Sequence, residues 1–215
     1  KREGINPLLV NLEKVELDPN KRPFVSIHVA LYNEKRVVER LIRACTSMEW
    51  YVEEGRTANL EPRNENSQVQ SLKFKPSTLL WARVQSSNYE LIIADDSTDE
   101  TTELAKQTLI SGGWQLVASK PDNRASSDTG SSLSDPGSER EGAEIFVFTK
   151  AGAPTVKLIH RSSRAGFKGA ALQKALENTD SRAEYITIFD ADFVPYPDTI
   201  EQFIKSFQEV CGGLD

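Results

Sequence analysis

Residues 185–192 read Tyr-Ile-Thr-Ile-Phe-Asp-Ala-Asp, an apolar run of β-branched and aromatic side chains that ends in two carboxylates one residue apart. Such a run predicts a buried β-strand. Because an ionised carboxylate is costly to bury, we expect Asp190 and Asp192 to emerge at the end of this strand and to meet a cation or hydrogen-bond donors there. The stretch therefore predicts a sheet whose edge carries acidic groups.

Composition and charge restrict the class of protein. The 215 residues are 38% hydrophobic, which allows one substantial core, so we expect a single domain. The formal charge of −6 argues against broad binding to nucleic acid, whereas a nucleotide held through a metal stays possible. Cys45 and Cys211 are too few and too far apart for a disulfide scaffold, and no zinc site is readable.

Strand and helix patterns alternate along the chain. Strands are predicted at 24–31, 89–94 and 185–192, with a hairpin at 144–149 and 155–160. Helical stripes follow the strands, and their apolar members are Val37, Val38, Leu41, Ile42, Cys45, Leu104, Ala105, Leu109, Ala170, Ala171, Leu172, Ala175, Leu176, Ile200, Phe203, Ile204 and Phe207. The alternation predicts an α/β fold, a Rossmann-like, mainly parallel sheet with helices on both faces.

The remaining segments are polar or short. Residues 1–22 form a lead-in to the domain at 23–210, residues 51–88 an insertion or long loop, and residues 211–215 a tail. A short strand at 114–117 precedes residues 119–142, whose Ser, Asp, Gly and Pro content predicts a mobile loop. His28 lies inside the first strand, where we expect a packed, hydrogen-bonded histidine. No apolar run is long enough to cross a bilayer, and the start without Met suggests an excerpt of a longer protein.

Three strands end in polar clusters, which are Asn33-Glu34, Asp95-Asp96, and Asp190 with Asp192. Ligands bind at the carboxyl ends of the strands in such sheets, so we expect all three to meet at one edge. An Asp-x-Asp pair alone is weak evidence of a functional site, because the solvated end of a strand can carry the same two residues. Two carboxylates with water and diphosphate oxygens suit Mg²⁺ or Mn²⁺ far better than zinc. One of Asp95 and Asp96 can cap the next helix while the other accepts hydrogen bonds from a base or ribose.

A basic, glycine-bearing segment supplies the opposite charge. Arg161, Arg164 and Lys168 stand at the entrance to a helix, where backbone amides can approach an anion. A solvated basic turn is the alternative reading. Acids for a metal and bases for a phosphate are the two halves of a diphosphate site, and we therefore favour binding.

Four segments in order, 26–34, 95–99, 164–172 and 189–193, resemble the donor half of family-2 processive glycosyltransferases, in particular the cellulose synthase and glucomannan synthase-like branch. The resemblance implies a GT-A fold, incomplete at the C-terminus, and an inverting transfer. By the same resemblance Tyr32 and Asp96 flank the nucleobase, Arg164 and Lys168 approach the phosphates, and Asp192, helped by Asp190, holds Mg²⁺ or Mn²⁺. The implied donor-binding residues are Tyr32, Asn33, Glu34, Asp95, Asp96, Arg164, Lys168 and Asp190.

The resemblance implies a UDP- or GDP-sugar donor and a glycan acceptor as partners, and no nucleic acid. It also implies a location at the cytoplasmic face of a membrane, to which other parts of a parent chain would attach the protein. The family's Thr-Glu-Asp-like motif with the general base and its Gln-x-x-Arg-Trp motif do not occur after Asp192. We therefore expect this chain to bind donor and metal but to transfer sugar poorly, with the catalytic base beyond Asp215. Two alternatives stay open: a nucleotidyltransferase, although the usual glycine-rich loop after the first strand is missing, and a catalytically inactive interaction module.

Overall fold

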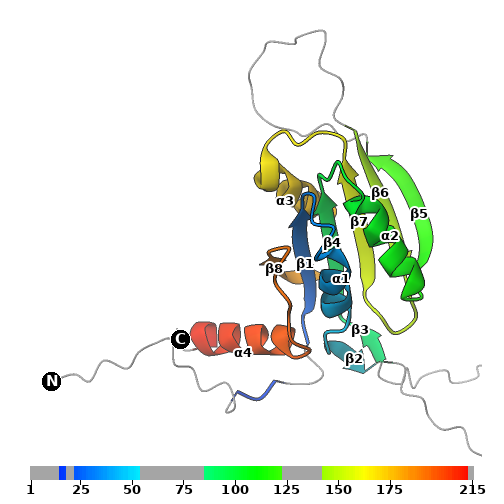
Figure 1. The fold of residues 1–215 in the computed structure, drawn as a ribbon. Coiled ribbons are helices and arrows are strands. Elements are labelled where there is room, and N and C mark those ends of the chain that lie inside the picture. The colour runs from blue at the N-terminus through cyan, green and yellow to red at the C-terminus, as the bar shows by residue number, and fades with distance from the viewer. Residues whose placement is uncertain (1–14, 18–21, 54–84, 123–141, 213–215) are drawn as a thin grey trace, which may run out of the picture.

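The computed structural model describes residues 15–17, 22–53, 85–122 and 142–212. Its centre is a six-stranded sheet in the order β5-β6-β7-β4-β1-β8 (Figure 1). The strands are β1 (Phe24–Leu31), β4 (Tyr89–Asp95), β5 (Gln115–Asp122), β6 (Ala143–Thr149), β7 (Thr155–Arg161) and β8 (Ala183–Phe189). Neighbours from β7 to β8 are parallel, while β6 is antiparallel to both β5 and β7. The predicted α/β fold with a mainly parallel sheet is confirmed, and it is consistent with the GT-A fold.

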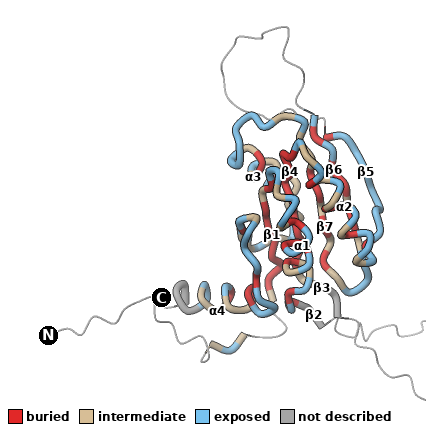
Figure 2. The backbone as a smooth tube through the Cα atoms, in the orientation of Figure 1, coloured by how far each residue is buried: buried red, intermediate tan, exposed pale blue. Residues whose placement is uncertain are grey.

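Helices cover both faces of this sheet. They are α1 (Val38–Thr46), α2 (Thr101–Ser111), α3 (Phe167–Glu177) and α4 (Thr199–Gly212). Side chains of a strand alternate between faces, so Leu91 of β4 packs in the cluster with α1 and α2, whereas its neighbour Ile92 packs with Ala171 of α3. Figure 2 shows the central strands buried between these layers. None of the helices in the described ranges is long and apolar enough to span a membrane.

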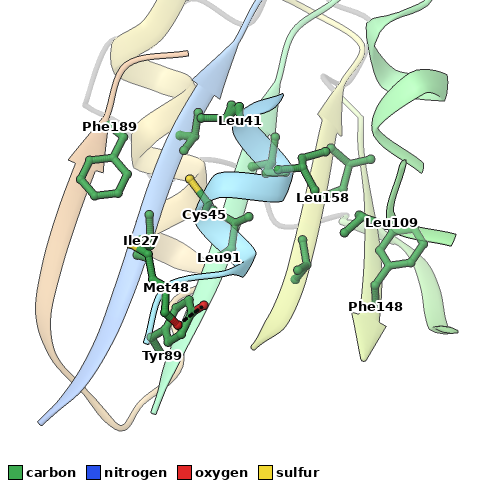
Figure 3. Packing of buried hydrophobic residues seen from close by; sticks show 14 of the residues in the cluster. Ile27, Leu41, Cys45, Met48, Tyr89, Leu91, Leu109, Phe148, Leu158 and Phe189 are labelled. Carbon is green, nitrogen blue, oxygen red and sulfur yellow. Dashed lines mark hydrogen bonds between the residues drawn. The ribbon is translucent and has the colours of Figure 1, made fainter. Parts of the chain in front are cut away.

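The larger core cluster lies beneath α1. Figure 3 shows Ile27, Leu91 and Leu158, from three neighbouring strands, facing the helix that carries Leu41 and Cys45. Each large aliphatic side chain that is fully buried in this way contributes about 1.5–3 kcal/mol. The core fixes the central strands, and with them the positions of the loops that follow.

The apolar stripe predicted for the first helix is confirmed, since Val38, Leu41, Ile42 and Cys45 are its buried residues. Cys45 is a free cysteine, and burial raises the pKa of its thiol to about 12. It therefore acts as a small apolar core residue that stays protonated.

A polar network is buried on the α3 face. The carboxylate of Glu90, which is 1% exposed, accepts hydrogen bonds from Ser26 Oγ at 2.8 Å and from the backbone amide of Asp180 at 2.7 Å. Its other oxygen lies 2.7 Å from Lys157 Nζ. His28 Nε2 lies 3.1 Å from Ser26 Oγ, and burial lowers the pKa of this histidine. The prediction of a packed, hydrogen-bonded His28 is confirmed.

One expectation about the last strand is wrong. β8 is an edge strand whose only described partner is β1, and its residues alternate in burial along its length. Ile186 is 44% and Ile188 is 54% exposed, whereas Phe189 is buried. An apolar run predicts a buried strand only when both faces are covered, and among the described residues the face with Ile186 and Ile188 is not.

The two long polar segments are only partly described. Residues 51–53 (β2, Tyr51–Glu53) and 85–87 (β3, Gln85–Ser87) form a two-stranded antiparallel sheet, so the ends of the predicted 51–88 loop are ordered. The strand predicted at 114–117 is longer than expected, because β5 reaches Asp122, and the predicted loop from 119 loses its first four residues. Residues 54–84 and 123–141 lie outside the described part.

Candidate functional site

The carboxyl ends of three neighbouring parallel strands converge. Leu31 at the end of β1 stands opposite Asp95 at the end of β4, and Val29 stands opposite Phe189 at the end of β8. The segments that follow, 32–34, 95–96 and 190–192, therefore leave the sheet at one edge. The prediction that the three strands end together is confirmed.

Asn33 fastens two of these segments together. Its backbone amide donates to Ser97 Oγ at 2.8 Å, and its Oδ1 accepts the backbone amide of Thr98 at 2.9 Å. Asn33 has a positive φ of 56°, a conformation that asparagine tolerates better than most side chains. The backbone carbonyl of the half-buried Glu34 accepts hydrogen bonds from the amides of Val37 and Val38, immediately before and at the start of α1. Backbone in the left-handed region, as at Asn33, is frequent at functional sites.

Asp95 is buried and holds the loop before α2. Its Oδ1 accepts the amide of Ser97 at 3.0 Å, and its Oδ2 accepts from Thr102 Oγ1 and lies 3.2 Å from His160 Nδ1. Burial alone would raise the pKa of this carboxyl, but the hydrogen bonds from His160, Ser97 and Thr102 outweigh burial and lower it. The carboxylate in turn raises the pKa of His160. Asp95 thus supports the loop before α2.

Asp96 is paired with Arg161 at the end of β7. The two guanidinium nitrogens Nε and Nη2 donate to Oδ1 at 2.7 Å and to Oδ2 at 2.6 Å. The side chains are 4% exposed for Asp96 and 9% for Arg161. This is the bidentate geometry that arginine and carboxylate favour.

Two further cations from the same segment reach the other strand ends. The guanidinium of Arg164 lies 3.5 Å from the centre of the Tyr32 ring, just after β1. Lys168 Nζ forms an ion pair with Asp190, just after β8. Together with Arg161 and Asp96, the segment 161–168 places one cation against the end of each of three strands. The basic turn is therefore part of the same site as the acids.

The backbone that carries these cations depends on Gly166. Its φ is +72°, and a Cβ added there would stand 2.6 Å from the Cβ of Ala170. The next residue, Phe167, also has a positive φ, of 50°, and begins α3. A glycine is required for this turn, which leads directly into a helix N-terminus, where anions are favoured.

The two acids after β8 are exposed and could serve as oxygen ligands to a hard divalent cation. Asp190 and Asp192 are both exposed, with 68% of the Asp190 side chain accessible. No group of three or more His, Cys, Asp or Glu side chains that could hold a metal occurs in the described ranges. In proteins Mg²⁺ is usually held by one or two carboxylates together with substrate phosphates and water, so Asp190 and Asp192 are the residues here that could hold it.

The sequence pattern missed the role of Arg161. We expected its side chain to face the phosphates of a ligand together with Arg164 and Lys168, whereas the structure pairs it with the carboxylate of Asp96. The sequence offered no direct signal for this pairing, because it depends on β7, which Arg161 ends, lying beside β4 in the sheet. Two adjacent parallel strands bring their last residues together.

Part of the chain matches a known protein family. Residues 133–214, which include the segment 161–168 and both acids after β8, match the model of the family Glycosyl transferase family 2. This part of the chain is thus similar to the family-2 glycosyltransferases. The predicted resemblance is confirmed.

Plant glycosyltransferases are among the similar proteins. The chain is 54% identical over 43 residues to a probable glucomannan 4-beta-mannosyltransferase 7 of Oryza sativa subsp. japonica, a match that covers 20% of this chain and 7% of that protein. It is 23% identical over 188 residues to a probable glucomannan 4-beta-mannosyltransferase 1 of Arabidopsis thaliana, covering 86% of this chain and 21% of that protein. The chain spans about a fifth of the length of this second relative.

Proposed function

We propose that this chain is the donor-binding part of a glycosyltransferase of polysaccharide synthesis, and that it holds a nucleoside diphosphate sugar together with Mg²⁺ or Mn²⁺. The observation that carries the proposal is the convergence of the cations at 161, 164 and 168 with the ends of β1, β4 and β8. Opposite charges on one sheet edge suit a ligand that brings both an anion and a cation.

Each group has a part in this proposal. The ring of Tyr32 carries Arg164 over one face and offers its other face for stacking with the nucleobase, and the Asp96 carboxylate accepts a hydrogen bond from the edge of the base. Arg164 and Lys168 bind the diphosphate, aided by the N-terminus of α3. Asp190 and Asp192 hold the divalent cation, which when bound offsets negative charge on the leaving nucleoside diphosphate.

The relatives suggest the class of sugar. Both are named as glucomannan 4-beta-mannosyltransferases, and we infer a hexose on GDP or UDP as the donor and a growing glycan as the acceptor. The placement of a longer parent protein at the cytoplasmic face of a membrane stays a prediction. A nucleotidyltransferase is disfavoured, because Tyr32-Asn33-Glu34 follow β1 where a glycine-rich phosphate loop would stand.

The 215 residues alone are proposed to transfer sugar slowly or not at all. They contain neither a Thr-Glu-Asp nor a Gln-x-x-Arg-Trp motif, and Asp190 and Asp192, the exposed acids at the site, are assigned to the metal. An inverting transfer needs a base for the attacking hydroxyl.

Calorimetry with UDP and GDP, each with and without Mn²⁺, tests the proposal. We expect one of the two nucleotides to bind in a metal-dependent way, and a radiolabelled sugar donor to give little polymer. Failure of both nucleotides to bind would favour an inactive interaction module, and robust polymer synthesis would refute the assignment of a purely donor-binding role.

A further inference from the structure

Arg161 is the most buried cation of the site, and the proposed function assigns the phosphates to Arg164 and Lys168 rather than to it. Its side chain is 9% exposed, and two nitrogens of its guanidinium each donate a hydrogen bond to one oxygen of Asp96. A guanidinium has N–H donors and no acceptor, so both oxygens of Asp96 meet Arg161 as acceptors. The pair therefore fixes both the orientation and the hydrogen-bonding sense of Asp96.

The same guanidinium also reaches the phosphate-binding segment. Nη1 donates to the backbone carbonyl of Ala165 at 3.3 Å, and Nη2 donates to that of Phe167 at 3.4 Å. These carbonyls flank Gly166, in the turn between Arg164 and Lys168. Arg161 thus connects the acid proposed to read the base with the turn proposed to bind the phosphates.

We propose that Arg161 is a positioning residue that sets the base specificity of the site, by making Asp96 an acceptor for bases that carry an imide or amide N–H. A carboxylate has about four lone-pair positions, of which Arg161 occupies two. Uracil and guanine present a ring N–H to such an acceptor. Cytosine and adenine present a lone pair on the ring nitrogen at the corresponding position, so two acceptors would face each other. This inference rests on the proposed function, in which Asp96 meets the base.

The expected selectivity follows from the cost of an unmade hydrogen bond. A buried acceptor left without its donor costs about 1–3 kcal/mol, which corresponds to a preference of roughly 5- to 150-fold. UDP should bind tighter than CDP, or GDP tighter than ADP, by a factor in this range. Substitution of Arg161 should lower that factor, because the carboxylate is then free to rotate away from the base.

The test compares UDP, CDP, GDP and ADP in the presence of Mn²⁺ by calorimetry, for the wild type and for Arg161→Lys, with thermal melting to verify the fold. Lysine keeps the positive charge next to Asp96 but cannot make the two parallel hydrogen bonds of a guanidinium. We expect the UDP:CDP or GDP:ADP affinity ratio to fall at least threefold in Arg161→Lys. The matched control is Arg164→Lys, three residues away, which should weaken all four nucleotides by the same factor.

The outcomes separate this inference from the proposed function. If none of the four nucleotides binds the wild type, the proposed function fails and the inference with it. If the wild type binds UDP and CDP equally, and GDP and ADP equally, the inference alone is overturned. It is also overturned if Arg161→Lys weakens every nucleotide equally and leaves the ratios unchanged, since a purely structural role would act in that way.

Discussion

Replacing Lys168 by methionine should change metal binding and nucleotide binding in opposite directions. Without ligand, Lys168 pairs with Asp190, the same carboxylate that we assign to the metal. A divalent cation must therefore displace the lysine, whereas a bound diphosphate gives the lysine a new partner. Lys168→Met removes the competitor for the metal and also removes a contact to the phosphates.

The structure bounds both effects. The side chains of Lys168 and Asp190 are 54% and 68% exposed, so their pair resembles an ordinary surface ion pair. Such a pair contributes at most about 1 kcal/mol, and the affinity for Mn²⁺ alone should rise by at most about fivefold. A hydrogen bond between an ammonium and a phosphate contributes about 1.5–3 kcal/mol, so the affinity for the nucleoside diphosphate should fall roughly 10- to 150-fold.

Electron paramagnetic resonance of free Mn²⁺ measures the first effect, and calorimetry with the nucleotide measures the second. Arg43→Met is a suitable control, because Arg43 belongs to a pair of similar exposure on α1, with side chains 63% and 65% exposed, and contacts Glu39 rather than the site. A drop in Mn²⁺ affinity in Lys168→Met without nucleotide, or an unchanged nucleotide affinity, would refute the reasoning.

Two predictions concern stability. Glu90→Gln removes the carboxylate that pairs with the Lys157 ammonium, whose side chain is only 19% exposed. The free energy of unfolding, measured in urea, should fall by about 3 kcal/mol. Adding Lys157→Met should recover part of this loss, and no recovery would argue against the pair. Because Asp95 raises the pKa of His160, the folded state binds a proton more tightly than the unfolded state, so the stabilisation is complete below about pH 6.5 and is lost as pH rises through the folded pKa. The stability advantage of the wild type over His160→Gln, followed by urea unfolding from pH 5.5 to 8.5, should shrink with rising pH, and growth of that advantage would contradict the assignment.

The sequence predicted the fold well where local patterns and topology agree. The apolar stripe of α1 and the continuous apolar run of β4 identify buried elements, because these elements are covered as their patterns require. β8 shows where the same reasoning fails. Its run from Tyr185 to Phe189 is as apolar as that of β4, but burial depends on what lies on each face of the sheet, and a sequence pattern does not contain that information.

The site was predicted in its parts more than in its pairings. The convergence of acids and bases follows from strands that end together, which the alternation of elements indicates. Which base meets which acid depends on strand order. The placement of β7 beside β4 brings Arg161 to Asp96, and the turn at Gly166 then carries Lys168 to Asp190. Asp96 and Arg161 are 65 residues apart in the chain and Lys168 and Asp190 are 22 apart, so both pairings depend on the three-dimensional fold.

The most direct test of the proposed donor site is the metal dependence of nucleotide binding in Asp192→Ala, with Asp198→Ala as the control. Both aspartates are exposed, and Asp198 lies six residues further on, where it accepts a hydrogen bond from Gln202 at the start of α4. We predict that Mn²⁺ strengthens binding of UDP or GDP to the wild type and to Asp198→Ala, and that this enhancement disappears in Asp192→Ala. Metal-enhanced binding that persists unchanged in Asp192→Ala would contradict the account.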